Sequence, residues 1–124
     1  MVAKRLFIMC LLALSGLVAS ADSDYYMRQA RRYMDDAEYY DRQAARYERD
    51  AEYYNREAKK HLNDADWYTR HKNPEKAAYY TRRAREATDK AQTQYGYAKR
   101  ARDKAEDNRR RAREALDRAE RERR

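Results

Sequence analysis

Apolar and polar positions recur along residues 22–124 at spacings of four and three, the pattern of a helical heptad repeat. Alanines lie seven residues apart from Ala30 to Ala65, and tyrosines do the same from Tyr26 to Tyr68, with His61 in the one gap. With alanine at position a and tyrosine at position d, the pattern predicts a seam against which a second helix packs. Two heptads make one 14-residue repeat, as in DSDYYMRQARRYMD followed by DAEYYDRQAARYER.

The heptads continue beyond a single interruption at Asn73-Pro74. Alanine again occupies every position a from Ala77 to Ala119. Three more alanines stand at position d, Ala87, Ala101 and Ala115, so that 16 of the 18 alanines in residues 22–124 belong to the seam. Asn is a favourable helix N-cap, Pro suits the first helical position, and Glu75 complements the positive helix start. We expect a helix over about 24–70, a turn over 71–73 and a helix over 74–122.

These elements define the predicted fold class. It is all-α, a long antiparallel two-helix coiled-coil hairpin with an Ala/Tyr seam, which could dimerise to a four-helix bundle. Pairing residues whose numbers add up to 145 puts each seam tyrosine of the first helix opposite an alanine of the second, as in Tyr54 with Ala91. Large side chains facing small ones fill a close interface and disfavour slipped pairings.

Charged side chains beside the seam fit the same register. It predicts the ion pairs Asp64–Arg83, Glu57–Lys90, Asp36–Arg111, Asp41–Arg109 and Glu48–Arg102, together with a Met34–Leu116 contact. Because an exposed ion pair contributes only about 0.2–1 kcal/mol, these charges would select the orientation of the helices more than they hold the fold.

Residues 1–21 have the features of a secretory signal peptide. Lys4 and Arg5 precede a short apolar run, which closes at Ala19-Ser20-Ala21. Such a segment is removed during secretion, and its apolar run is too short to span a membrane. We therefore expect cleavage before Asp22 and a secreted mature chain, residues 22–124, without a membrane span.

Composition narrows the classes of protein that the mature chain could represent. Residues 22–124 contain no Val, Ile, Phe or Cys, which excludes a mixed aliphatic core and a disulfide-stabilised scaffold. They contain no thiol and no glycine-rich phosphate loop, and Ser23 is their only serine. His61 and His71 lack the spacing of metal ligands. We expect no enzyme, and neither a cofactor nor a metal.

The candidate interaction residues are four aromatic side chains at heptad position c, outside the seam: Tyr25, Tyr39, Tyr53 and Trp67. They recur every four helical turns, about 21 Å. One interpretation is that they widen the apolar stripe so that two hairpins pack together. Another is that exposed phenols undergo cross-linking or hydroxylation. A third is that a partner protein docks along the stripe.

Positive charge is concentrated in the second helical stretch. Residues 22–73 hold 11 basic and 12 acidic side chains, whereas residues 74–124 hold 17 and 10. The candidate polyanion-binding residues are Arg109, Arg110, Arg111 and Arg113, which could contact the sulfate or phosphate groups of a sulfated glycan or nucleic acid. Interleaved acids are equally typical of a solvated helix face.

The expected function is structural. The alanine seam resembles the close-packed antiparallel alanine coiled coils of several unrelated proteins. The secreted, tyrosine-rich, basic character is similar to tanned or adhesive matrix precursors such as eggshell and byssus components. We therefore expect a secreted, self-associating, homo-oligomeric protein of an extracellular matrix, coat or secreted material. A polyanion-binding module is the alternative.

Overall fold

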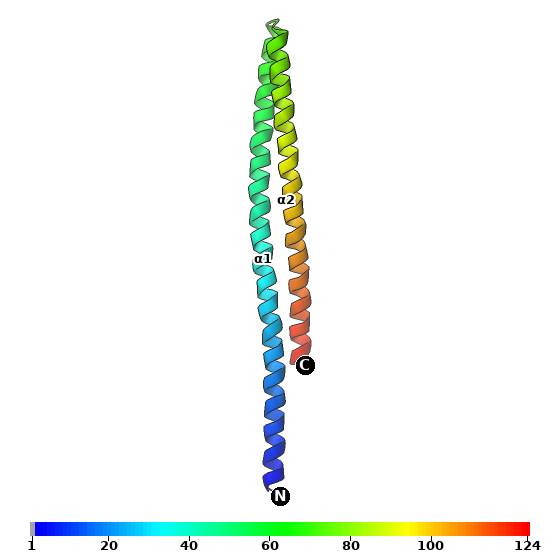
Figure 1. Cartoon of the computed structure of the whole chain (residues 1–124). Coiled ribbons are helices and arrows are strands. Elements are labelled where there is room, and N and C mark those ends of the chain that lie inside the picture. Colours follow the sequence, from blue (N-terminus) through cyan, green and yellow to red (C-terminus); the bar gives the residue numbers. More distant parts are fainter. Residues whose placement is uncertain (1) are drawn as a thin grey trace. The chain divides into compact units, whose positions relative to one another are not determined.

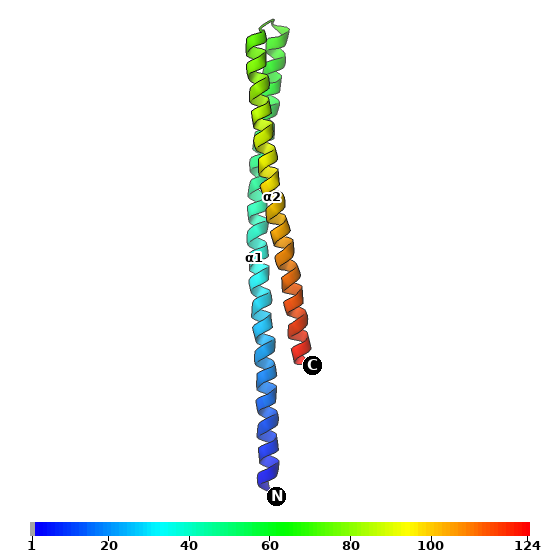
Figure 2. The same ribbon diagram turned by 45° about the vertical axis from the view of Figure 1, so that its right-hand side comes forward.

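The structure is a computed structural model that describes the backbone of residues 2–124 and the side chains of residues 21–124. It consists of two helices, α1 (Val2–Arg70) and α2 (Pro74–Arg123), which pack against each other (Figures 1 and 2). The predicted signal segment, residues 1–21, lies outside the described side chains except for Ala21. No helix among the described residues is long and apolar enough to cross a membrane.

A short turn joins the helices, and backbone hydrogen bonds close the end of α1. The Asn73 amide donates to the Tyr68 carbonyl (2.9 Å) and the Lys72 amide to the Thr69 carbonyl (3.2 Å). This is a Schellman motif, in which the residue after the helix adopts the left-handed conformation. Lys72 occupies that position with φ 58°.

Asn73 caps α2, as the sequence predicts. Its side-chain Oδ1 accepts a hydrogen bond from the Lys76 amide (3.2 Å), and its backbone carbonyl accepts one from the Ala77 amide (3.1 Å). Pro74 follows at the first helical position, where its missing N–H leaves no hydrogen bond unmade.

Alanine forms the buried layer between the helices. Of the 16 seam alanines, 15 are buried, with exposed fractions of 0–7%, and Ala77 beside the turn is half-buried. The tyrosines at position d are only half-buried. The helices therefore approach each other over alanine, while the larger rings lie along the edges of the seam.

Ser23 continues the buried layer one heptad before Ala30. It is 2% exposed, its Oγ donates to the Ala119 carbonyl (3.2 Å), and it accepts a hydrogen bond from Arg123 Nε (3.0 Å). The alanine pattern does not include Ser23 because serine is polar, although Ser23 lies seven residues before Ala30 in the sequence.

One predicted ion pair is present within residues 39–104. Arg102 binds Glu48 through two parallel hydrogen bonds of 3.0 and 3.1 Å, and its Nη1 lies 3.4 Å from Asp41. The hydrogen bonds and charge of Glu48, followed by the charge of Asp41, raise the pKa of the Arg102 guanidinium. This network ties α1 to α2.

Candidate interaction surface

The 14-residue repeat builds the same aromatic pair four times on α1. In each pair a ring at position c stands edge-on to the seam ring that follows it, with centroids 4.9–5.4 Å apart and interplanar angles of 69–86°. Edge-to-face packing is a favoured geometry for aromatic rings. The four pairs are Tyr25–Tyr26, Tyr39–Tyr40, Tyr53–Tyr54 and Trp67–Tyr68.

The outer rings of these pairs are the predicted interaction residues, and each is half exposed. Their exposed fractions are 50% for Tyr25, 51% for Tyr39, 52% for Tyr53 and 50% for Trp67. Such uniformity follows from the repeat, because each ring stands at the same heptad position and packs against the tyrosine that follows it. The structure thus displays four large rings to solvent at one position of the helix.

A cation from α2 lies over the inner, seam ring of every pair. The cation-to-centroid distances are 5.9 Å for Arg118 over Tyr26, 5.4 Å for Lys104 over Tyr40, 5.7 Å for Lys90 over Tyr54 and 5.2 Å for Lys76 over Tyr68. An exposed cation–π contact contributes about 0.5–1 kcal/mol. From one contact to the next, the residue number of the tyrosine in α1 rises by 14 and that of the cation in α2 falls by 14, as expected for antiparallel helices.

These contacts take the place of predicted ion pairs. Lys90 reaches the Tyr54 ring, although the sequence register assigned it to Glu57, and Arg83 lies 5.9 Å over Tyr79. Arg111 binds Asp107 within its own helix, at 3.3 Å. A long cationic side chain beside a seam can reach either an acid or a ring, and Lys90 and Arg83 lie over rings whereas Arg111 binds an acid.

Three open grooves lie beside the aromatic pairs. Groove 1 lies between Tyr25–Tyr26 and Arg111/Arg118, and encloses about 520 Å³. Groove 2 is lined by Tyr39, Tyr40, Tyr47, Tyr97, Arg100 and Lys104, and encloses about 240 Å³. Groove 3 lies between Tyr53–Tyr54 and Arg83/Lys90, and encloses about 180 Å³. Each groove therefore has aromatic walls on α1 and cationic side chains on α2.

Groove 2 differs from grooves 1 and 3 at two residues of α2, Tyr97 and Arg100, where the other two grooves have an arginine and a glutamate. Tyr97 belongs to a heptad series that runs from Lys76 to Arg118, and all the remaining positions of this series are Lys or Arg. Tyr97 instead places its ring against the seam ring of Tyr47, with centroids 5.4 Å apart and an interplanar angle of 49°. The sequence shows this break in the basic series, but it does not show that two rings from different helices meet there.

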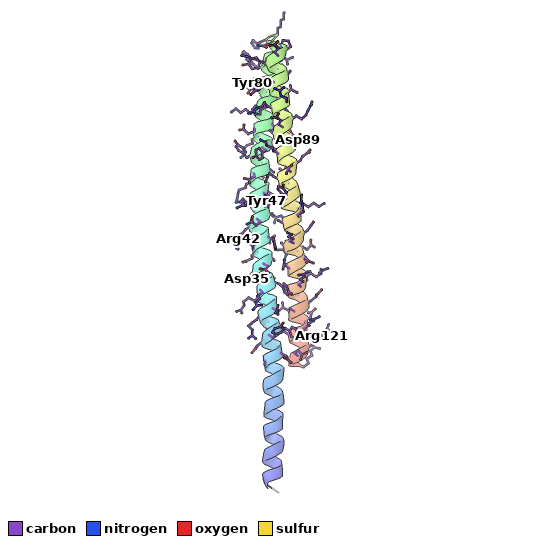
Figure 3. All side chains as sticks on the ribbon, in the orientation of Figure 1. Asp35, Arg42, Tyr47, Tyr80, Asp89 and Arg121 are labelled. Atoms are coloured by element: carbon purple, nitrogen blue, oxygen red, sulfur yellow. The ribbon has the colours of Figure 1, made fainter. Side chains whose placement is uncertain are left out.

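Both histidines pack against aromatic rings, and the partner of His61, Tyr80, is labelled in Figure 3. His71 stacks on Trp67 with centroids 3.8 Å apart, and its Nδ1 lies 2.7 Å from the Trp67 carbonyl oxygen. Tyr80 lies between His61 (6.1 Å) and Tyr68 (5.4 Å, 3° from parallel). Among the residues with described side chains, no three potential ligands gather to hold a metal ion.

The candidate polyanion-binding residues have acidic neighbours. Arg110 and Arg111 both bind the carboxylate of Asp107. Arg113 is exposed and Arg109 is half-buried. Because one carboxylate neutralises part of the charge of two arginines, the field at this run is weaker than the sequence alone suggests.

Comparison with known proteins supplies no relative from which a function could be transferred. No protein-family model, curated protein or solved structure matches the chain.

Proposed function

We propose that this chain is a secreted structural protein that self-associates through the aromatic face of α1 and contributes to an extracellular matrix, coat or secreted material. The observation that carries the proposal is the repeated, half-exposed aromatic pair. Pairing of α1 with α2 covers the alanines but leaves both rings of each pair partly in water. A second copy would cover them.

The rings offer enough apolar surface for association. A tyrosine presents roughly 150–250 Å² of surface, so covering its exposed half would contribute about 2 kcal/mol. Tyr39, Tyr53 and Trp67 alone would then supply about 6 kcal/mol before the cost of bringing two molecules together is counted. Burial of one ring would not offset the cost of association, whereas burial of several repeated rings would.

The chemistry of the same helix face favours a second copy of this chain as the partner. Between the rings, position c carries cations, so the series reads Tyr39, Arg46, Tyr53, Lys60 and Trp67. A copy displaced by one heptad would place its cations over these rings and its rings under these cations. The molecule already uses that pairing internally, where Lys90 lies over Tyr54. Two such copies would form a four-helix, coiled-coil-like bundle.

Exposed phenols extend the proposal to covalent hardening. Tyr25, Tyr39 and Tyr53 present about half of their surface to solvent. In an assembled material, cross-linking or hydroxylation of these rings would join neighbouring bundles. Trp67, which is stacked on His71, would act in association.

The signal-like segment, residues 1–21, supports secretion. Ser23, the second residue after the predicted cleavage site, is already buried against α2. Cleavage before Asp22 would therefore keep the contact of Ser23 with α2.

Expression of the full sequence in cells with a secretory pathway tests this proposal. We expect protein in the medium whose N-terminal residue is Asp22, and which elutes at the mass of a dimer or a larger assembly. Retention inside the cell with residues 1–21 attached would contradict secretion. A secreted protein that stays monomeric at high concentration would contradict a structural role.

The excess of basic residues in α2 favours one alternative, a module that binds a sulfated glycan or nucleic acid. On that hypothesis, heparin binding weakens steeply with added salt and is lost when Arg109, Arg110 and Arg111 are changed to Gln. A matched control replaces Arg82, Arg83 and Arg85 by Gln. Equal loss in both variants would indicate nonspecific attraction by net charge, and an unchanged affinity would remove the alternative.

A further inference from the structure

We propose that Tyr47 and Tyr97 form an oxidative coupling site, at which hydrogen peroxide and a haem peroxidase join the two rings into a dityrosine bridge between α1 and α2. The inference rests on the proposed function, because it requires secretion into an oxidising environment. It differs from cross-linking of the outer rings, since the bond forms within one molecule.

The geometry of this pair suits a bond between two ring edges. Tyr47 and Tyr97 come from different helices, their centroids are 5.4 Å apart, and their planes are inclined by 49°. At this centroid distance the rings are direct neighbours, and rotation about the side-chain bonds would bring the carbons ortho to the two hydroxyls into contact. Both rings line groove 2, and Tyr97 is 39% exposed. An oxidant can therefore reach them.

Neighbouring side chains hold the pair in place. The guanidinium of Arg46 lies 5.9 Å from the centroid of the Tyr47 ring, and that of Arg100 lies 5.1 Å from the centroid of the Tyr97 ring. Each ring thus packs against a cation as well as against the other ring. Because the two rings belong to one molecule and lie next to each other, coupling within the molecule is favoured over coupling between molecules.

The other ring contacts are less suited to the same reaction. The outer and inner rings of each aromatic pair meet edge to face, at 69–86°, which directs an edge at a face instead of at another edge. Tyr68 and Tyr80 also join the two helices, but their planes are parallel within 3°. His61 stacks on Tyr80 and Tyr79 stands edge-on to it, so this ring has little room to turn.

The reaction balances with peroxide as the oxidant. Each phenol gives up one electron and its hydroxyl proton, and the two phenoxyl radicals form one carbon–carbon bond ortho to the oxygens. The hydrogens displaced from those ring carbons return to the oxygens as the rings become aromatic again. The protein loses two hydrogen atoms, and one hydrogen peroxide is reduced to two waters. The product ties α1 to α2 covalently and restricts the unfolded chain, as other cross-links do.

Oxidation of the dilute secreted protein tests the site. The protein is treated with a haem peroxidase and hydrogen peroxide, and the products are separated by size and mapped by mass spectrometry. We expect dityrosine fluorescence in the band of a single chain, a mass lower by two hydrogens, and a linked pair of peptides containing Tyr47 and Tyr97. Tyr97→Phe, which keeps the ring but lacks the phenol, should abolish this product.

Tyr95→Phe is the matched control, because Tyr95 belongs to the same turn of α2 and its hydroxyl accepts a hydrogen bond from Asn55 in α1. This variant should retain the Tyr47–Tyr97 bridge. The inference is overturned if the single-chain product is absent, if it links other tyrosines, or if Tyr97→Phe leaves it unchanged. Sedimentation of the same samples before oxidation reports self-association separately, so failure of coupling is distinguishable from failure of assembly.

Discussion

At the scale of single residues, size decides which side chains the two helices enclose. Ala44 and Ala51 are completely buried, whereas the much larger Tyr40 and Tyr54 remain half-buried. Helices that approach closely leave room for a methyl group at the contact, and a phenol ring must extend along the edge, where its hydroxyl can stay in water. The small alanines thus allow the helices to approach closely, and the tyrosines make the surface beside them aromatic.

Lys72 adopts a backbone conformation that is sterically unfavourable for any residue with a Cβ atom. With φ 58° it occupies a left-handed position at which glycine carries no steric penalty. We expect Lys72→Gly to raise the free energy of unfolding by about 0.5–1 kcal/mol, measured by urea denaturation. Lys59→Gly, in the exposed interior of α1, should lower it by about 1 kcal/mol. A loss of stability in Lys72→Gly would contradict the Schellman turn.

Gly96 lies in the interior of α2 without a structural need for glycine. Its φ is not positive, and an added Cβ would meet nothing closer than a side-chain nitrogen of Arg100, at 4.0 Å. Gly96→Ala should therefore raise the free energy of unfolding by about 0.5–1 kcal/mol. The reverse change at an exposed position of the same helix, Ala78→Gly, should lower it by a similar amount. A destabilised Gly96→Ala variant would show that α2 is bent or crowded there.

At the scale of elements, heptad spacing predicts the buried layer well. Position a identifies alanines that the structure buries, and Asn73-Pro74 marks the start of α2 because its cap and its proline act locally. Side-chain partners are harder to predict. The heptad letter of Lys90 does not decide between Glu57 and the Tyr54 ring, since both lie within reach of a flexible side chain.

The outer surface could be predicted in part. The exposure of Tyr25, Tyr39 and Tyr53 follows from their heptad position. Their edge-on packing and the grooves beside them depend on side-chain directions that spacing alone does not give. Contact between Tyr47 and Tyr97 was missed for the same reason, because a tyrosine in a basic series can turn toward solvent or toward the seam.

Enlarging one buried alanine tests how the elements pack. Ala98 is 3% exposed, so Ala98→Leu should crowd the seam and lower the free energy of unfolding by about 1–3 kcal/mol, measured by thermal and urea denaturation. Ala78→Leu makes the same change at an exposed position of α2 and should alter stability by less than about 0.5 kcal/mol. The opposite ranking would show that Ala98 does not face α1.

At the scale of the whole molecule, the two helices have different roles in the proposed assembly. Residues 22–73 are nearly neutral and carry the aromatic pairs, whereas residues 74–124 carry the excess of basic side chains. Cations of α2 cover the inner rings, and the outer rings remain available. Self-association through the outer rings would cover surface that the chain by itself leaves exposed.

Sedimentation equilibrium of the secreted protein over a wide concentration range tests the central claim most directly. We predict a dimer or a larger assembly for the unaltered chain, and a shift toward monomer for the double variant Tyr39→Ser/Tyr53→Ser. Tyr95→Ser, which removes an exposed tyrosine from α2, should assemble as the unaltered chain does. A monomer at every concentration, or equal weakening by Tyr95→Ser, would contradict association through the aromatic face of α1.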